Sequence, residues 1–299
     1  MSKAESPAPS LAHDPISELP PLRDIIREAG LSARKSLGQN FLLDLNITRR
    51  IARSAGPLEG VKVLEIGPGP GGLTRGLLLE GCAGVVSIER DERFRPALTD
   101  LSAVSEGRFS PLFADALEVD YAQLARESGV TRIVANLPYN IATPLIVGWI
   151  AAKSWPPWYD RLVAMLQREV AERIAAAPGT EAYGRLSVLA QLRSKARILM
   201  SLPPRAFTPS PKVSSALVEI TPFAPAPDVE AALVEKVTAA AFGQRRKMLR
   251  SSLASLGVDA HSLLEMADID PTERAERLSI ADFVSLAQAL KILQSNAQS

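Results

Sequence analysis

Short apolar, β-branched runs alternate with helical patterns through the first half of the chain. One such run covers residues 61–66 and leads into a turn rich in glycine and proline at residues 67–72, after which residues 73–79 resume a helical pattern. Gly67, Gly69 and Gly71 lack a Cβ, so a ligand can approach the backbone closely, and the following helix points unpaired N–H groups at it. The order of strand, tight turn and helix therefore predicts a ligand-binding turn.

Three later strand-like runs lead to polar side chains. Residues 85–89 end in Glu89, residues 109–113 precede Asp115, and residues 133–135 precede Asn136. Ligands bind at the carboxyl ends of parallel strands, so these side chains are expected at one sheet edge. Glu89 has the spacing from the glycines of a ribose ligand, which suits NAD and S-adenosylmethionine alike. A carboxylate at Asp115 can accept a hydrogen bond from an adenine amino group.

The tetrapeptide Asn136-Leu137-Pro138-Tyr139 is the most specific motif. Pro138 holds the backbone stiff after the strand, and the side-chain oxygen of Asn136 and the carbonyl of Leu137 can accept hydrogen bonds from an –NH2 group. The ring of Tyr139 offers a stacking face for a base. The motif predicts an acceptor site for a planar amine, although it also fits a proline-terminated strand with a packed tyrosine.

The remaining pattern predicts an α/β fold followed by helices. Strands and helices alternate to about residue 167, as in a parallel, doubly wound sheet, and strands at 195–202 and 214–220 have only a loop between them, so they are expected to pair antiparallel at one edge. Prolines at 222, 225 and 227 mark a linker. From residue 229 onward the patterns are helical. The predicted divisions are a disordered tail at 1–21, an α/β domain at 22–221 and a small all-α domain at 228–299.

Composition narrows the chemistry. The 299 residues, 46% hydrophobic and 22% charged, are typical of a globular protein, and a single cysteine permits no internal disulfide and no cysteine-based zinc site. With only two histidines, a Ser-His-Asp hydrolase or a histidine metal site is not expected, so we predict no metal. No apolar run reaches the roughly 18 residues of a membrane-spanning helix, and the first 21 residues lack the features of a signal peptide or organelle presequence. We expect a cytoplasmic protein without membrane contact.

The net charge of +1 does not itself indicate a nucleic-acid partner, but the basic residues are clustered. Arg193, Lys195 and Arg197 alternate along a predicted strand and would share one face. A second group is expected on one helix, with three further basic residues elsewhere, and all of these would contact phosphate groups. This predicted RNA-binding set is Arg245, Arg246, Lys247 and Arg250, with Arg34, Lys35 and Lys212.

Ordered motifs from about residue 35 to about residue 280 resemble the KsgA (RsmA) type of ribosomal RNA adenine dimethyltransferases. They are KSLGQNFL at 35–42, the turn at 65–74, DA at 115–116, NLPY at 136–139, LQREV at 166–170, YGRLS at 183–187, FTPSPKV at 207–213 and FGQRRK at 242–247. The resemblance implies a Rossmann-like, S-adenosylmethionine-dependent methyltransferase domain, mostly parallel with an antiparallel edge, followed by a small helical domain.

The resemblance also implies roles for individual residues. The implied donor-binding residues are Asn40, Leu42, Gly67, Gly69, Glu89, Asp115, Ala116 and Asn136. Asn136, Leu137 and Pro138 would form the acceptor site, with the target adenine stacked between Tyr139 and Phe207.

The implied function is dimethylation of adenines, two adjacent ones, in the RNA of an assembling small ribosomal subunit, carried out by a monomer. Three alternatives remain at this point. A resistance-type methyltransferase of large-subunit RNA is the nearest, although residues 244–250 resemble the KsgA type more. A mainly non-catalytic assembly factor would use the basic groups but would not need Glu89, Asp115 and Asn136 together. A nicotinamide-dependent oxidoreductase fits the glycine turn but leaves the Asn136 motif unexplained.

Overall fold

The computed structural model describes residues 14–28, 30–152, 154–244 and 246–296, and of Lys35 the backbone alone. The chain divides into two compact units, Met1–Pro138 with Arg205–Pro211, and Tyr139–Pro204 with Lys212–Ser299. This division comes from the structure, and the division into domains drawn from the sequence stays a prediction. Within the described residues no helix combines the length and the apolar character needed to span a bilayer.

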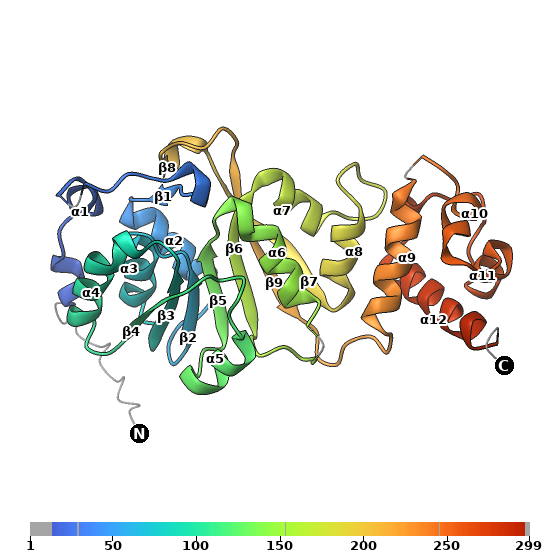
Figure 1. The fold of residues 1–299 in the computed structure, drawn as a ribbon, viewed down its shortest axis with the longest axis horizontal. Coiled ribbons are helices and arrows are strands. Elements are labelled where there is room, and N and C mark those ends of the chain that lie inside the picture. The colour runs from blue at the N-terminus through green and yellow to red at the C-terminus, as the bar shows by residue number, and fades with distance from the viewer. Residues whose placement is uncertain (1–13, 29, 153, 245, 297–299) are drawn as a thin grey trace, which may run out of the picture. The chain divides into compact units, whose positions relative to one another are not determined.

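The first unit contains a parallel sheet flanked by helices (Figure 1). Its strands are β1 (Phe41–Leu42), β2 (Lys62–Ile66), β3 (Gly84–Glu89), β4 (Phe109–Phe113), β5 (Arg132–Asn136) and β8 (Phe207–Thr208). Its helices are α1 (Leu22–Glu28), α2 (Leu45–Ser54), α3 (Gly72–Leu79), α4 (Arg95–Val104) and α5 (Tyr121–Ser128). β2 pairs in parallel with β3 and β5, and β3 with β4. β1 and β8 form a separate antiparallel pair.

The second unit contains an antiparallel group of strands followed by helices. Its strands are β6 (Arg161–Gln167), β7 (Ser194–Leu202) and β9 (Ser215–Pro222). Its helices are α6 (Tyr139–Ile150), α7 (Arg168–Ala175), α8 (Arg185–Leu192), α9 (Ala231–Gly243), α10 (Leu249–Ser252), α11 (Ala260–Met266) and α12 (Ile280–Asn296). β9 pairs antiparallel with both β6 and β7, which confirms the antiparallel edge predicted from the sequence.

The strand order of the main sheet is β4-β3-β2-β5-β6-β9-β7. This mostly parallel sheet with an antiparallel edge confirms the predicted fold class. The parallel strands β2, β3 and β5 are short and largely buried; in β2 every residue after Lys62 is buried. Runs that are apolar on both faces are expected of parallel strands covered by helices on both sides.

Pro111 lies in β4, the strand that begins the sheet order. Val85 N donates to Arg108 O at 2.7 Å, and Ala114 N donates to Glu89 O at 3.0 Å. Because the backbone groups of successive residues point to opposite sides of a strand, the even-numbered residues 108–114 face β3. Pro111 therefore faces away from β3.

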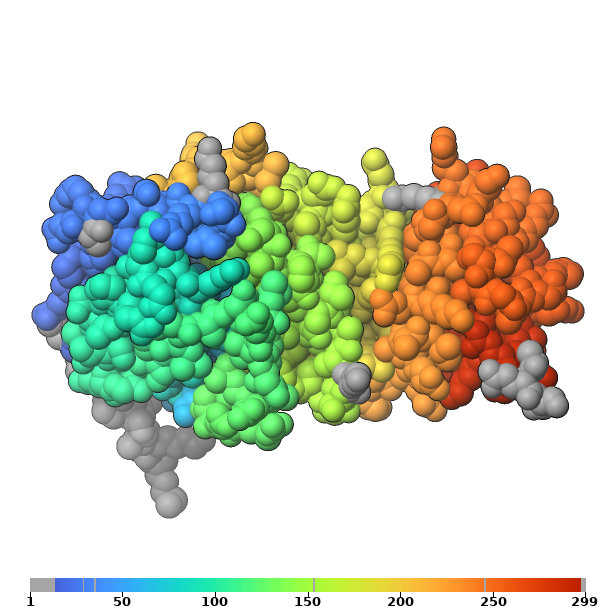
Figure 2. All heavy atoms as spheres, viewed as in Figure 1, coloured from blue at the N-terminus to red at the C-terminus, as the bar shows by residue number. Residues whose placement is uncertain are grey.

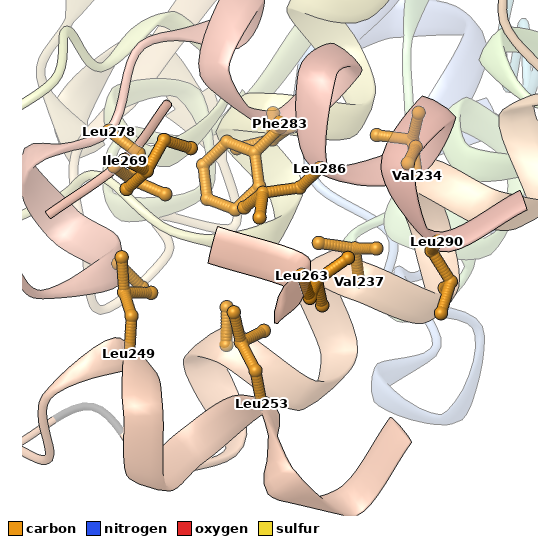
Figure 3. Close-up of a cluster of buried hydrophobic side chains, with 14 of the residues drawn as sticks. Val234, Val237, Leu249, Leu253, Leu263, Ile269, Leu278, Phe283, Leu286 and Leu290 are labelled. Carbon is orange, nitrogen blue, oxygen red and sulfur yellow. The ribbon is translucent and has the colours of Figure 1, made fainter. Parts of the chain in front are cut away.

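The helices of the second unit enclose their own apolar core (Figure 3). Phe283 of α12 is fully buried and stacks on Phe242 of α9, with ring centroids 5.6 Å apart. Tyr183 meets the edge of Phe242, and its hydroxyl donates to Leu278 O at 2.9 Å. Val188 of α8 belongs to the same cluster, so this core includes residues on both sides of the predicted proline linker. Figure 2 shows the atoms of α9 to α12 in orange and red.

Residues 14–21 differ from the disordered tail expected over 1–21, of which residues 1–13 lie outside the described part. Asp14 caps a short 3₁₀ helix at Pro15–Glu18, and Ile16 is 2% exposed. Arg108 Nη2 lies 3.1 Å from Asp14 Oδ2, and Arg75 Nη1 donates to Pro20 O at 2.7 Å. One buried apolar side chain and two long-range partners therefore hold this segment, and local composition does not indicate them.

Candidate active site

The glycine turn between β2 and α3 has the backbone conformations that require glycine. Gly67, Gly69 and Gly71 have φ values of 68°, 54° and 88°, in the left-handed region. A Cβ at Gly67 would lie 3.3 Å from the ring of Pro138, and one at Gly69 would lie 3.1 Å from the ring of Phe41. The turn therefore lies against both the Asn136 motif and β1.

Glu89, at the end of β3, presents a buried carboxylate beside this turn. It is 6% exposed; Oε2 accepts from Gly69 N at 3.0 Å and Oε1 accepts from Asp91 N at 2.8 Å. Burial is the main cause that raises the pKa of Glu89, the Asp91 carboxylate adds to the rise, and backbone hydrogen bonds from Asp91, Gly69 and Arg90 oppose it. A carboxylate has about four lone-pair sites, so Glu89 keeps accepting capacity for a ligand hydroxyl.

Asp115 follows β4 and is held from both sides. Its Oδ1 accepts from Leu117 N at 3.0 Å, and its Oδ2 lies 3.1 Å from Arg90 Nη1. The side chain is 21% exposed, and the adjacent Ala116 is buried. These contacts fix the direction of the carboxylate and leave lone pairs for an amino group.

Asn136 ends β5 and is half-buried. Its Nδ2 donates to Asn40 O at 2.9 Å. Because only the amide nitrogen can donate, this bond assigns the orientation of the side chain and leaves Oδ1 as an acceptor. The residues that follow Asn40 form β1, where Leu42 pairs with Phe207 of β8. The segment 40–42 therefore contacts Asn136 at one end and the Phe207 strand at the other.

The two predicted stacking residues lie in different units, Phe207 in the first and Tyr139 in the second. Tyr139 is half-buried at the start of α6, and its hydroxyl lies 2.5 Å from Ser215 Oγ in β9. Burial raises the pKa of Tyr139, so the phenol is neutral at physiological pH. Phe207 is only 3% exposed, so stacking of a base on its ring requires movement of the side chains that cover it.

Comparison with known proteins identifies the family. The family model described as ribosomal RNA adenine dimethylase matches residues 30–291. The chain belongs to the ribosomal RNA adenine dimethylase family. This membership confirms the resemblance read from the motifs.

Two curated relatives match this chain over nearly the whole length of both proteins. The relative from Xanthobacter autotrophicus is 56% identical over 94% of this chain and 98% of its own, and that from Chelativorans sp. is 57% identical over 91% and 98%. Both are named ribosomal RNA small subunit methyltransferase A.

Solved structures give the same picture of the fold. A dimethyladenosine transferase from Plasmodium falciparum is 25% identical with a TM-score of 0.73, covering 84% of this chain and 97% of that one. The 23S rRNA methyltransferase ErmE, 24% identical over 84% of this chain and all of its own, has a TM-score of 0.64 and shows the fold alone.

The basic residues of the dimethylase differ from the prediction in one respect. Arg246 and Lys247 are not on a common helix with Arg250, because α9 ends at Gly243 and α10 begins at Leu249. The backbone leaves the helix at Gln244, with φ −131° and ψ 63°, and Leu249 N, the first N–H of α10, donates to Glu273 O at 2.8 Å. Arg246, Lys247 and Arg250 are nevertheless exposed.

The other residues predicted to contact RNA differ in their exposure and in their partners. Arg34 and Lys212 are exposed, whereas Arg245 and the side chain of Lys35 lie outside what the structure describes. Arg197 forms an ion pair with Glu219, whose side chain is 5% exposed, so part of its charge balances a buried acid rather than remaining available for phosphate.

The sequence analysis assigned no role to three residues that the structure places in the site: Ser215, Asp91 and Gln39. Ser215 contacts Tyr139 across 76 positions, and Gln39 Nε2 donates to Asp91 Oδ2 at 2.9 Å across 52 positions. Gln39 stands inside the KSLGQNFL motif, so its position carried a signal although its partner could not be read from it. In the part of the chain that the structure describes, no group of three or more His, Cys, Asp or Glu side chains is arranged to hold a metal ion.

Glu65 of β2 is a buried carboxyl group with a shifted pKa. The residue is 1% exposed, and Thr74 Oγ1 donates to its Oε2 at 2.6 Å. Burial raises the pKa of Glu65 to about 8, with the Thr74 hydrogen bond opposing and the Glu89 carboxylate adding to the rise. The folded dimethylase therefore retains a proton that the unfolded chain releases above a pKa of 4.5.

This proton predicts a pH dependence of stability. The contribution of Glu65 is fully present below pH 4.5 and is lost as the pH rises through about 8. Glu65→Gln keeps an acceptor for Thr74 but does not titrate. As the pH rises across this window, the free energy of unfolding of the variant should therefore increase relative to that of the wild type by up to about 1.4 kcal/mol per pH unit. Urea unfolding of both proteins at the two ends of the window measures the gain. Parallel pH profiles would contradict the shifted pKa.

Proposed function

We propose that this protein transfers methyl groups from S-adenosylmethionine to the exocyclic amines of two adjacent adenines in small-subunit ribosomal RNA. The observation that carries the proposal is the bond from Asn136 Nδ2 to Asn40 O, which joins the predicted amine acceptor to the predicted donor segment. Membership of the dimethylase family and the names of its 56–57% identical relatives support the same activity.

The residues around the glycine turn fit S-adenosylmethionine. Gly67 and Gly69 leave the backbone open where Cβ atoms would crowd Pro138 and Phe41, and Glu89 offers buried acceptor sites suited to ribose hydroxyls. Asp115 would accept from the adenine amino group, beside the buried Ala116, and Asn40 and Leu42 would contact the donor from the N-terminal segment. The sulfonium group of the bound donor supplies an electrophilic methyl carbon.

The acceptor residues act mainly by positioning the adenine amine. Its lone pair is delocalised into the ring, so reaction requires the nitrogen to turn towards tetrahedral geometry. The lone pair must also lie in line with the sulfur–methyl bond of the donor, which breaks as the nitrogen–methyl bond forms. Hydrogen bonds from the amine to Asn136 Oδ1 and the carbonyl of Leu137 favour that geometry and the positive charge that develops on nitrogen. Alignment of this kind can lower a barrier by roughly 7–11 kcal/mol, and the nitrogen afterwards releases its proton to solvent.

Stacking and phosphate contacts complete the proposal. Tyr139, whose orientation is fixed by Ser215, and Phe207 are proposed to hold the target ring, and Pro138 fixes the backbone between the acceptor groups and Tyr139. Exposed Arg34, Lys212, Arg246, Lys247 and Arg250, with Lys35 and Arg245, are the proposed phosphate contacts. We infer a cytoplasmic monomer that acts on an assembling small subunit.

The decisive experiment incubates the purified protein and labelled S-adenosylmethionine with unmodified small subunits and, separately, with unmodified large subunits, and then locates every labelled base. Dimethyladenosine in small-subunit RNA alone is the expected result. Label confined to large-subunit RNA would replace the proposal with the resistance-type activity. Binding of small subunits and donor without any label would identify an assembly factor instead.

A further inference from the structure

A chain of hydrogen bonds connects the donor segment to the ribose carboxylate through Gln39. Gln39 precedes Asn40 directly, and its Oε1 accepts from Arg34 N at 2.8 Å. Its Nε2 donates to Asp91 Oδ2 at 2.9 Å. Both ends of this amide are therefore engaged, one within its own loop and one on the loop after β3.

Asp91 is the fixed point of this connection. It is 4% exposed, its carboxylate accepts from Arg93 Nε at 2.9 Å, and its backbone N donates to Glu89 Oε1 at 2.8 Å. The hydrogen bonds from Arg93 and Gln39 hold the pKa of Asp91 at about 2, so it is an anion at all physiological pH values. Arg93 also donates to Ser32 O at 3.2 Å, which is a second contact between the segment before β1 and the residues that follow β3.

We propose that Gln39 is a positioning residue for the methyl donor. Through Asp91 it fixes the segment 39–42 relative to Glu89, while Asn40 O is fixed by Asn136 at the other side. The inference rests on the proposed function, in which Asn40 and Leu42 contact the donor. Without the Gln39 bond, the segment must be ordered when the donor binds, and that entropy is subtracted from the binding free energy.

Gln39→Ala is therefore expected to raise the dissociation constant of S-adenosylmethionine by about ten-fold or more, corresponding to roughly 1.4 kcal/mol. The turnover number at saturating donor should stay within about two-fold of wild type, because Gln39 touches no reacting atom. Calorimetric titration of the donor and methylation kinetics over a donor series measure the two effects. Gln123→Ala is the matched control, since Gln123 Nε2 also donates to a carboxylate, that of Glu127 at 2.7 Å, but on the exposed surface of α5.

A pair of isosteric variants separates positioning from general loosening of the fold. Gln39→Glu keeps the acceptor for Arg34 N but sets a carboxylate against Asp91, so donor affinity should fall further. Adding Asp91→Asn removes the repulsion between the two carboxylates but sets an amide donor against Arg93 Nη2, so it should recover only part of the affinity. Thermal unfolding of each variant shows whether the fold is retained.

Two results would overturn the inference: unchanged donor affinity in Gln39→Ala, or a fall in turnover at saturating donor with no change in affinity. Each of these outcomes leaves the proposed function standing, provided that the wild type methylates small subunits.

Discussion

Replacement of Asn136 by alanine is expected to abolish methyl transfer while leaving RNA association intact. The variant loses the Oδ1 acceptor for the target amine and also the Nδ2 bond that holds Asn40. Loss of one preorganised polar group at a reacting centre typically costs about 10²–10³ in rate, and here a second group is displaced with it. Single-turnover methylation and filter binding of small subunits give the two measurements.

Asn46→Ala is the matched control for this variant, since Asn46 is an exposed asparagine at the start of α2. Asn136→Asp adds a second test, because a carboxylate cannot donate to Asn40 O and should fail although its size is the same. Normal turnover in Asn136→Ala would remove Asn136 from the proposed mechanism.

Gly72→Ala is expected to disrupt both donor binding and stability, although alanine is the better helix former. A Cβ at Gly72 would lie 2.3 Å from Leu42 O and 3.2 Å from Leu22 Cδ1. The first contact is with backbone, so β1 must move, and it carries Leu42 and Asn40 with it. Overpacking of this kind costs about 1–3 kcal/mol of stability, and we expect donor affinity to fall by about 100-fold or more.

The control is Gly148→Ala, because Gly148 also lies in a helix, α6, but has no neighbour within 4 Å of the added Cβ. That variant should be stabilised by up to about 1 kcal/mol, since helix propensity alone acts there. Urea unfolding and donor titration of both variants measure the contrast. Equal stabilisation of the two proteins would show that β1 is not packed against α3 as described.

The parallel strands and their polar ends could be predicted because each signal is local. A run such as 61–66 followed by Gly67 and Gly69 specifies a strand and a turn within a dozen residues. The rule that parallel strands present their carboxyl ends at one edge then places Glu89 and Asn136 together without any knowledge of packing. The antiparallel pairing of β7 and β9 was likewise predictable, because no crossover α-helix separates them.

The errors and omissions lie where a distant partner decides. Helical periodicity continued through residues 244–248, but the backbone leaves the helix at Gln244, and Leu249 N, which begins α10, is paired with the distant Glu273 O. At residues 14–21 the structure pairs Asp14 with Arg108, a residue far along the chain that local composition could not indicate. In the site, the partner of Tyr139, Ser215, is a residue type too common for its position to indicate the contact.

Pro111 has a consequence for the behaviour of the protein at high concentration. Exposed strand margins can recruit strands from other copies through their backbone donors, and such recruitment underlies domain swapping and aggregation. On β4 the outward-facing position 111 has no N–H to offer, so an incoming strand would meet a gap in the middle of the five-residue ladder. Pro111 thus disfavours the pairing of β4 with a strand of another copy.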